Sequence, residues 1–139
     1  MLSAVNARGQ LHFRLLETGG VSAEAFIDYL QALLHDIPGR IFLVLDRHPA
    51  HVAKATQAFV ASVADRLEVF FLPGYAPQLN PDEWVWKNVK HDHAGKAAVM
   101  GEPELRSILT RALSRLQALP GLIRSIFSDP DLAYIKASL

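Results

Sequence analysis

The chain contains no cysteine and no long run of apolar residues. Without cysteine it can form neither a disulfide framework nor a zinc site built from thiolates. No apolar stretch reaches the roughly 18 residues that a membrane-spanning helix requires. The N-terminus also lacks the basic and then apolar pattern of a signal peptide. We therefore expect a protein of the reducing cytoplasm.

The chain also lacks an excess of charge of either sign. Its 14 Lys and Arg residues balance 14 Asp and Glu residues. This balance argues against a strong electrostatic attraction of this segment alone to nucleic acid, so contact with a polynucleotide would need local patches or another domain. Hydrophobic residues make up 50% and charged residues 20% of the 139 residues, which predicts one folded domain over residues 1–139.

Hydrophobic periodicity predicts an α/β fold. Strands are expected at 2–6, 11–17, 41–45 and 67–72. Helices are expected from the Ser22 cap to the Pro38-Gly39 stop, at 51–64, from the Asn80-Pro81 start, at 103–119, and in a tail at 121–127 and 130–137. The strand, helix, strand order within 41–72 predicts a parallel pair of strands joined by a right-handed crossover.

Two acids stand where α/β proteins usually place their chemistry. The apolar run IFLVLD ends on Asp46, and Glu83 falls in the first turn of the helix that Asn80-Pro81 opens. Such carboxylates can meet at one edge of a sheet, where their oxygens favour magnesium or manganese. Asp82 competes with Glu83, which we prefer because of its place after Asn-Pro. In the simpler interpretation, Asp46 caps a turn and Glu83 interacts favourably with the positive end of the helix dipole.

Basic side chains and histidines lie close to both acids in the sequence. His48 and His51 are spaced for a turn and a helix start, where a capping or surface role is about as well supported as substrate contact. A second group follows Glu83 at helical spacing and consists of Lys87, Lys90 and His91. This group can contact DNA phosphates or can form a solvated, salt-bridging face.

The segments FLVLDRHPAH and FFLPGYAPQLNPDEWVWKNVK resemble the second and third acidic motifs of DDE-type transposases, in particular of the mariner-related insertion-sequence group. The resemblance runs through nearly all of residues 1–139. It implies a ribonuclease-H-like mixed sheet flanked by helices. It also implies a site for two Mg²⁺ or Mn²⁺ ions, with Asp46 as a shared ligand and Glu83 holding one ion, for DNA strand cleavage and transfer.

The chain departs from the family pattern in three respects. The family carries a first catalytic aspartate on the first strand of the fold, and this chain begins after it, so we expect a sheet without its first central strand and a chain that is inactive alone. Arg47 stands where the family commonly has asparagine, and it can pair with Asp46 or with a phosphate. The family's N-terminal helix-turn-helix region also has no counterpart.

Three functional hypotheses follow. The leading one is the C-terminal part of a DDE catalytic domain that acts on DNA, at transposon ends and target, either as a homo-oligomer or paired with an N-terminal transposase half. The second is a non-catalytic remnant that serves as a folding or oligomerisation module through an unpaired sheet edge and a leucine-rich helix. The third is a nuclease complete within this chain, with Asp65 or Asp92 as the further acid.

Overall fold

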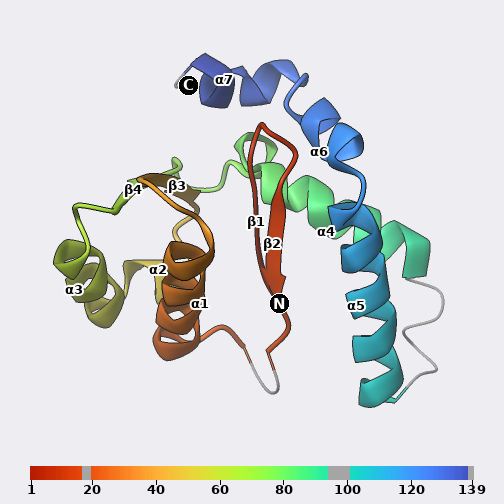
Figure 1. The fold of residues 1–139 in the computed structure, drawn as a ribbon, viewed down its shortest axis with the longest axis horizontal. Coiled ribbons are helices and arrows are strands. Elements are labelled where there is room, and N and C mark those ends of the chain that lie inside the picture. The colour runs from red at the N-terminus through yellow and green to blue at the C-terminus, as the bar shows by residue number, and fades with distance from the viewer. Residues whose placement is uncertain (17–19, 94–100, 138–139) are drawn as a thin grey trace. The chain divides into compact units, whose positions relative to one another are not determined.

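The computed structural model describes residues 1–16, 20–93 and 101–137. The chain divides into two compact units. The first comprises residues 1–2 and 16–76, and the second comprises residues 3–15 and 77–139. Figure 1 shows the elements of both units. Among the residues that the structure describes, no helix is long and apolar enough to cross a membrane.

The first unit is built around two parallel strands, β3 (Ile41–Leu45) and β4 (Leu67–Phe71). Ile41 pairs with Leu67 and Leu45 pairs with Phe71, so both strands end at the same edge of the sheet. The connection between them contains the short helix α2 (Pro49–Val52) and the helix α3 (Lys54–Ser62). The predicted parallel pair is confirmed, and the bounds of both strands agree with the prediction to within one residue.

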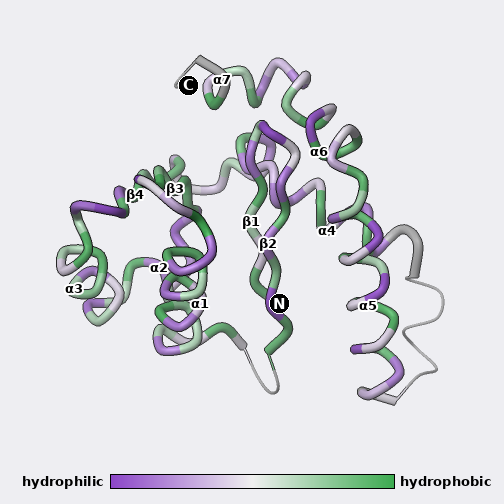
Figure 2. The backbone as a smooth tube through the Cα atoms, in the orientation of Figure 1, coloured by the Kyte–Doolittle hydropathy of each residue, from purple (hydrophilic) through white to green (hydrophobic). Residues whose placement is uncertain are grey.

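Helix α1 (Ala23–Asp36) begins at Ser22, whose hydroxyl accepts the backbone N–H of Ala25 at 3.1 Å. Hydrophobic and hydrophilic segments alternate along this helix in Figure 2. Four of its side chains enter the core of the first unit: Phe26, Tyr29, Leu30 and Leu33. A residue far along the sequence satisfies carbonyl groups at the C-terminal end of α1 and just after it. The Arg66 guanidinium donates to the carbonyls of Leu34, Ile37 and Gly39.

The single helix predicted over residues 51–64 is wrong. The structure instead has α2 and α3, separated by Ala53 in an extended conformation with φ −59° and ψ 147°. Two side chains from α3 satisfy carbonyls at this break: the Thr56 hydroxyl donates to Ala50 O at 2.6 Å, and the Gln57 amide donates to Val52 O at 2.7 Å. These bonds replace helical hydrogen bonds and make the break stable.

The second unit pairs a hairpin with helices. Strands β1 (Leu2–Val5, its first residue counted with the first unit) and β2 (Leu11–Arg14) form a two-stranded sheet. Five further elements follow: η1 (Pro77–Leu79), α4 (Pro81–His93), α5 (Glu102–Gln117), α6 (Pro120–Ile126), and the tail of η3 (Pro130–Leu132) with α7 (Ala133–Ala137). The strands predicted at 2–6 and 11–17 and the predicted helices of this unit are confirmed, although β2 is shorter than expected.

The core of the second unit is apolar and comes mainly from helices. Its buried side chains are Leu11, Val85, Val89, Leu113, Leu116, Ile123, Ile126, Phe127 and Leu132. The hairpin turn needs Gly9, since its φ is +90° and a Cβ there would collide with the Pro120 carbonyl oxygen. The Gln117 side chain donates to Leu11 O at 2.7 Å, which ties α5 to β2.

Candidate functional site

The Asp46 carboxylate lies directly after β3, at the edge of the sheet where the parallel strands end. Its Oδ1 accepts the backbone N–H of His48 at 3.0 Å and lies 2.9 Å from Nδ1 of His51. The side chain is 51% exposed. Among the residues that the structure describes, no hydrogen bond or ion pair involves its Oδ2. One oxygen is therefore held by the protein while the other stays open to solvent or a ligand.

His48 and His51 have different surroundings. The Nδ1 of His48 accepts the backbone N–H of Ala50 at 3.1 Å and so caps α2, while its side chain is exposed. His51 is largely buried, and its ring lies 4.4 Å from the Phe26 ring between centroids. The capping interpretation is borne out for His48. Contact of either histidine with DNA stays a prediction.

Arg47 is exposed, and its guanidinium carbon lies 5.4 Å from the centroid of the Phe71 ring. Within the described part of the chain it forms no ion pair with Asp46. A guanidinium that stacks on an aromatic face keeps its five N–H donors at the ring edge, where they can meet an anion. The Arg47 guanidinium therefore lies over Phe71, at the edge of the sheet where β3 and β4 both end.

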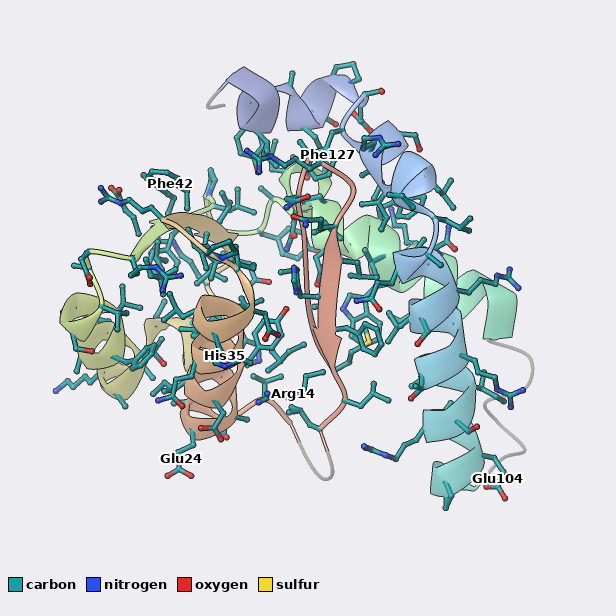
Figure 3. All side chains as sticks on the ribbon, viewed as in Figure 1. Arg14, Glu24, His35, Phe42, Glu104 and Phe127 are labelled. Carbon is teal, nitrogen blue, oxygen red and sulfur yellow. The ribbon has the colours of Figure 1, made fainter. Side chains whose placement is uncertain are left out.

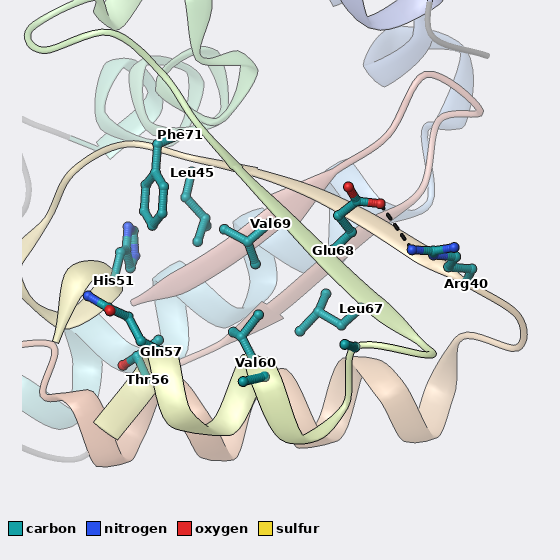
Figure 4. Close-up of a pocket in the computed structure, with 12 residues that line it drawn as sticks. Arg40, Leu45, His51, Thr56, Gln57, Val60, Leu67, Glu68, Val69 and Phe71 are labelled. Atoms are coloured by element: carbon teal, nitrogen blue, oxygen red, sulfur yellow. Dashed lines mark hydrogen bonds and ion pairs between the residues drawn. The ribbon is translucent and has the colours of Figure 1, made fainter. Parts of the chain in front are cut away.

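An open, apolar pocket of about 480 Å³ adjoins this end of the sheet. Figure 4 shows His51 and Phe71 at one end of it and the ion pair of Arg40 with Glu68 at the other. Helix α3 supplies Val60 along its floor. Because the lining is apolar, the pocket does not resemble a site for a phosphate or a metal ion.

The second acid lies in α4, which Asn80 caps. The Asn80 side chain accepts the backbone N–H of Asp82 at 3.0 Å, and its carbonyl accepts that of Glu83 at 3.1 Å. The Asp82 carboxylate accepts the Ser3 hydroxyl at 2.6 Å. The Glu83 carboxylate is partly exposed and has no hydrogen bond or ion pair within the described part of the chain. This contrast favours Glu83 over Asp82 as a ligand.

The basic residues of α4 are exposed where the structure describes them. Lys87 is exposed, and Nζ of Lys90 lies 5.4 Å from the centroid of the Trp86 ring. His91 lies in α4, but its side chain falls outside the described residues, as does that of Asp92. Trp84 and Trp86 are both partly buried, whereas Val85 and Val89 fill the core.

The structure brings Asp46 together with His48, His51 and Arg47, all in the first unit. Glu83 belongs to the second unit, so the convergence of the two carboxylates stays a prediction. Among the described residues, no group of three His, Cys, Asp or Glu side chains could hold a metal ion. Asp65 precedes β4 while Asp46 follows β3, and parallel pairing places them at opposite ends of the strands. Asp65 is therefore not a partner for Asp46.

The contact between His51 and Asp46 was not foreseen in the sequence. Its signal is the five-residue spacing, in which Pro49 starts a helical turn that carries the imidazole back over the end of the strand. The ring of Phe71 beneath Arg47 was also not foreseen, because only the parallel register with Leu45 places it there.

Comparison with solved structures supports the fold. The crystal structure of the catalytic domain of Mos1 mariner transposase matches with a TM-score of 0.59, over 92% of this chain and 70% of that chain, at 14% sequence identity. At this identity the similarity shows the fold, and the predicted α/β, ribonuclease-H-like fold class is confirmed. The single mixed sheet is not formed among the described residues, where β1 pairs with β2 and β3 pairs with β4 in two separate sheets. The absence of a first central strand stays a prediction.

No curated protein matches the sequence. The family model described as DDE superfamily endonuclease matches residues 1–106, a span that includes β3 with Asp46 and α4 with Glu83. This match covers most of the chain and agrees with the fold of the mariner catalytic domain. The chain therefore belongs to the DDE superfamily of endonucleases.

Proposed function

We propose that the chain is the C-terminal part of a DDE transposase catalytic domain, in which Asp46 and Glu83 bind divalent cations for DNA strand cleavage and transfer. The observation that carries this proposal is the arrangement of Asp46 at the end of β3. Its Oδ1 accepts the His48 N–H and lies 2.9 Å from His51 Nδ1, while no described residue bonds Oδ2 in a side chain that is 51% exposed. A half-exposed carboxylate with one open oxygen suits a hard cation such as Mg²⁺ or Mn²⁺. Two such ions, when bound, would activate the attacking oxygen and stabilise the leaving oxygen.

Glu83 is the second ligand in this proposal. Its position in the first turn of α4 leaves the carboxylate partly exposed, while Asn80 holds the backbone of that turn. Asp82 is bonded to Ser3 and is the less suitable donor. The proposal requires Glu83 and Asp46 to approach the same ions in the complete domain.

DNA is the proposed partner. The cation of Arg47 lies beside Asp46 on the Phe71 ring, and the exposed Lys87 and Lys90 lie along the same helix as Glu83. We assign to these residues, together with His48, His51 and His91, contacts to DNA phosphates. Such contacts would position the backbone near the acids without reading its sequence.

The chain alone should be catalytically incomplete. The resemblance to DDE transposases implies a third acid, which has no assigned position within residues 1–139. We propose that activity requires another polypeptide segment, such as an N-terminal transposase half or a longer form of this chain, to supply it. In the complete enzyme we expect this chain to associate either with further copies of itself or with an N-terminal transposase half.

A Mn²⁺ titration followed by calorimetry tests the proposal. The unsubstituted chain should bind Mn²⁺, and Asp46→Asn should abolish measurable binding because it removes the charge of the ligand. The amide oxygen that this substitution introduces can still accept the His48 N–H, so the turn after β3 should survive. Glu83→Gln should weaken binding to a smaller degree in the isolated chain.

Asp129→Asn is the matched control. Asp129 accepts the backbone N–H of Asp131 at 2.9 Å, in the same two-residue geometry as Asp46 with His48, but at the start of η3. Its substitution should leave Mn²⁺ binding unchanged. Equal binding by the unsubstituted chain and Asp46→Asn would contradict the proposal.

One observation favours the second candidate, a remnant that acts as an oligomerisation module. On the face of the β3 and β4 pair opposite the core, Phe42 is 62% and Phe70 is 47% exposed, with their ring centroids 6.3 Å apart. Figure 3 labels the Phe42 side chain on β3. Within the described residues β3 pairs with β4 alone, so its other edge has no strand partner there.

Sedimentation velocity separates the two candidates. A remnant that associates through this face should sediment as an oligomer that Phe42→Ser converts to monomer, with no response to Mn²⁺ in either variant. A half-site of the enzyme should respond to Mn²⁺ through Asp46 whatever its state of association.

A further inference from the structure

The His51 imidazole meets two oxygen atoms of Asp46 through a single nitrogen. Its Nδ1 lies 2.9 Å from the carboxylate Oδ1 and 3.1 Å from the backbone carbonyl oxygen of the same residue. A backbone carbonyl only accepts hydrogen bonds. Nδ1 must therefore carry the proton and act as the donor in both contacts, whether His51 is neutral or charged.

The ring of His51 is fixed by packing as well as by Asp46. Its side chain is 14% exposed, against 51% for Asp46. The ring centroid lies 4.4 Å from that of Phe26, a buried side chain of α1, and His51 also lines the pocket. Since the imidazole is held from outside the loop, it can hold the carboxylate in one orientation.

His48 cannot take over this role. Its Nδ1 accepts the Ala50 N–H, so that nitrogen is unprotonated and the ring belongs to α2 as a cap. The two rings lie 5.4 Å apart between centroids, and the contacts of their Nδ1 atoms require opposite tautomers. The only contact of His48 with the carboxylate in the described part of the chain comes from its backbone N–H.

We propose that His51 is a positioning residue for Asp46. Two N–H donors on Oδ1 prevent rotation of the carboxylate and leave Oδ2 turned outward for a hard cation. Partners of this kind, one step removed from the ion, orient ligands in metal sites generally. The inference rests on the proposed function, since it assigns Asp46 to a divalent cation, and it does not depend on His51 changing its charge.

The test compares Mn²⁺ affinity in variants of the full chain. His51→Phe keeps a ring against Phe26 but loses the donor, and it should weaken Mn²⁺ binding roughly tenfold. His51→Asn places an amide N–H near the position of Nδ1 and should restore most of the affinity. The matched control is His35→Phe, because His35 forms a similar contact with Asp36 at 3.1 Å but is exposed at the end of α1. This control should bind Mn²⁺ like the unsubstituted chain.

A second readout needs no metal. Long-range proton to nitrogen NMR correlations should show the Nδ1–H tautomer for His51 and the Nε2–H tautomer for His48. The opposite tautomer at His51 would overturn the inference, even if a variant at this position failed to fold.

The outcomes separate the inference from the proposed function. If Asp46→Asn abolishes Mn²⁺ binding while His51→Phe binds as tightly as the unsubstituted chain, the positioning role is wrong and the proposed function stands. If Asp46→Asn has no effect on Mn²⁺ binding, the proposed function fails and the inference falls with it. Restoration by His51→Asn supports the donor rather than the shape of the ring.

Discussion

Asp46 in the first unit and the acids of α4 in the second unit are held in different ways. The carboxylate of Asp46 contacts residues two and five positions further along the chain, through the His48 N–H and the His51 ring. Asp82 is bonded to Ser3, 79 positions away, and η1 before α4 is bonded to Tyr134, 55 positions beyond Leu79. The strand-end acid therefore depends on its own loop, whereas α4 depends on distant segments.

This difference teaches where each site is vulnerable. The site at Asp46 should survive changes elsewhere as long as its own loop and helix α1, on which His51 packs, are intact. A site on α4 requires the whole second unit to be folded. Loss of packing in one unit should consequently affect the acid of that unit more than the acid of the other unit. Core substitutions in each unit are the strongest test of this difference.

The largest expected effects come from Leu30→Ala in the first unit and Leu113→Ala in the second. Both side chains are fully buried, and each substitution should lower the free energy of unfolding by about 2–5 kcal/mol, because it removes apolar contacts and leaves a cavity. Urea denaturation followed by circular dichroism measures the loss. Leu122→Ala, at an exposed leucine of α6, is the control and should cost far less.

Ser3→Ala breaks the long-range tie to α4. The Ser3 hydroxyl donates to Asp82 at 2.6 Å in a partly buried position, and a hydrogen bond to a charged group contributes about 1.5–3 kcal/mol when shielded from water. We expect a loss of about 1.5 kcal/mol in urea denaturation. Asp82→Asn should cost less than Ser3→Ala, since the amide oxygen can still accept. A loss smaller than that of an exposed substitution such as Ser107→Ala would contradict this account.

The two helix caps compare the units directly. Ser22 caps α1 and Asn80 caps α4, each through a side-chain oxygen that accepts a backbone N–H. Ser22→Ala and Asn80→Ala should each lower the free energy of unfolding by about 1 kcal/mol. Gly in place of either residue should recover most of that loss. Asn80→Ala should also weaken any contribution of Glu83 to Mn²⁺ binding, whereas Ser22→Ala should leave it unchanged.

The smallest effect is expected for Tyr134→Phe. The phenol donates to Leu79 O at 2.6 Å, so its removal should cost about 0.5 kcal/mol near neutral pH. Burial raises the pKa of Tyr134 above its ordinary value. A raised pKa means that the stabilisation is complete below pH 10 and is lost as the pH rises through the value in the folded protein. Tyr134→Phe should therefore reduce the alkaline fall in Tm; an unchanged fall would contradict this.

Local patterns predicted most elements of both units, and the break that they missed lies in the first unit. Ser22, the IFLVL run and the stop at Pro38-Gly39 are local signals, and α1 and β3 form where those signals predict. The break at Ala53 was not predicted, because it depends on the Thr56 and Gln57 side chains bonding to carbonyls of the preceding turn. Helical periodicity does not record such competition.

The candidate site was predictable in the same uneven way. The position of Asp46 after β3 follows from the strand pattern, and the Asn80 cap before Glu83 follows from the Asn-Pro pair. The bond from Ser3 to Asp82 and the ring of Phe71 beneath Arg47 join residues that only folding brings together. No spacing rule along the chain predicts either contact.

The four-residue helix α2 has a consequence for how this site can change over generations. One turn of helix is too short to be stable alone. The position of His51 therefore depends on Thr56 in the next helix, which is buried and donates a hydrogen bond to Ala50 O. A substitution at Thr56, which does not contact Asp46, can thereby change how the Asp46 carboxylate is held. Thr56→Val, which is nearly identical in shape but lacks the hydroxyl, would remove this bond and loosen the position of His51.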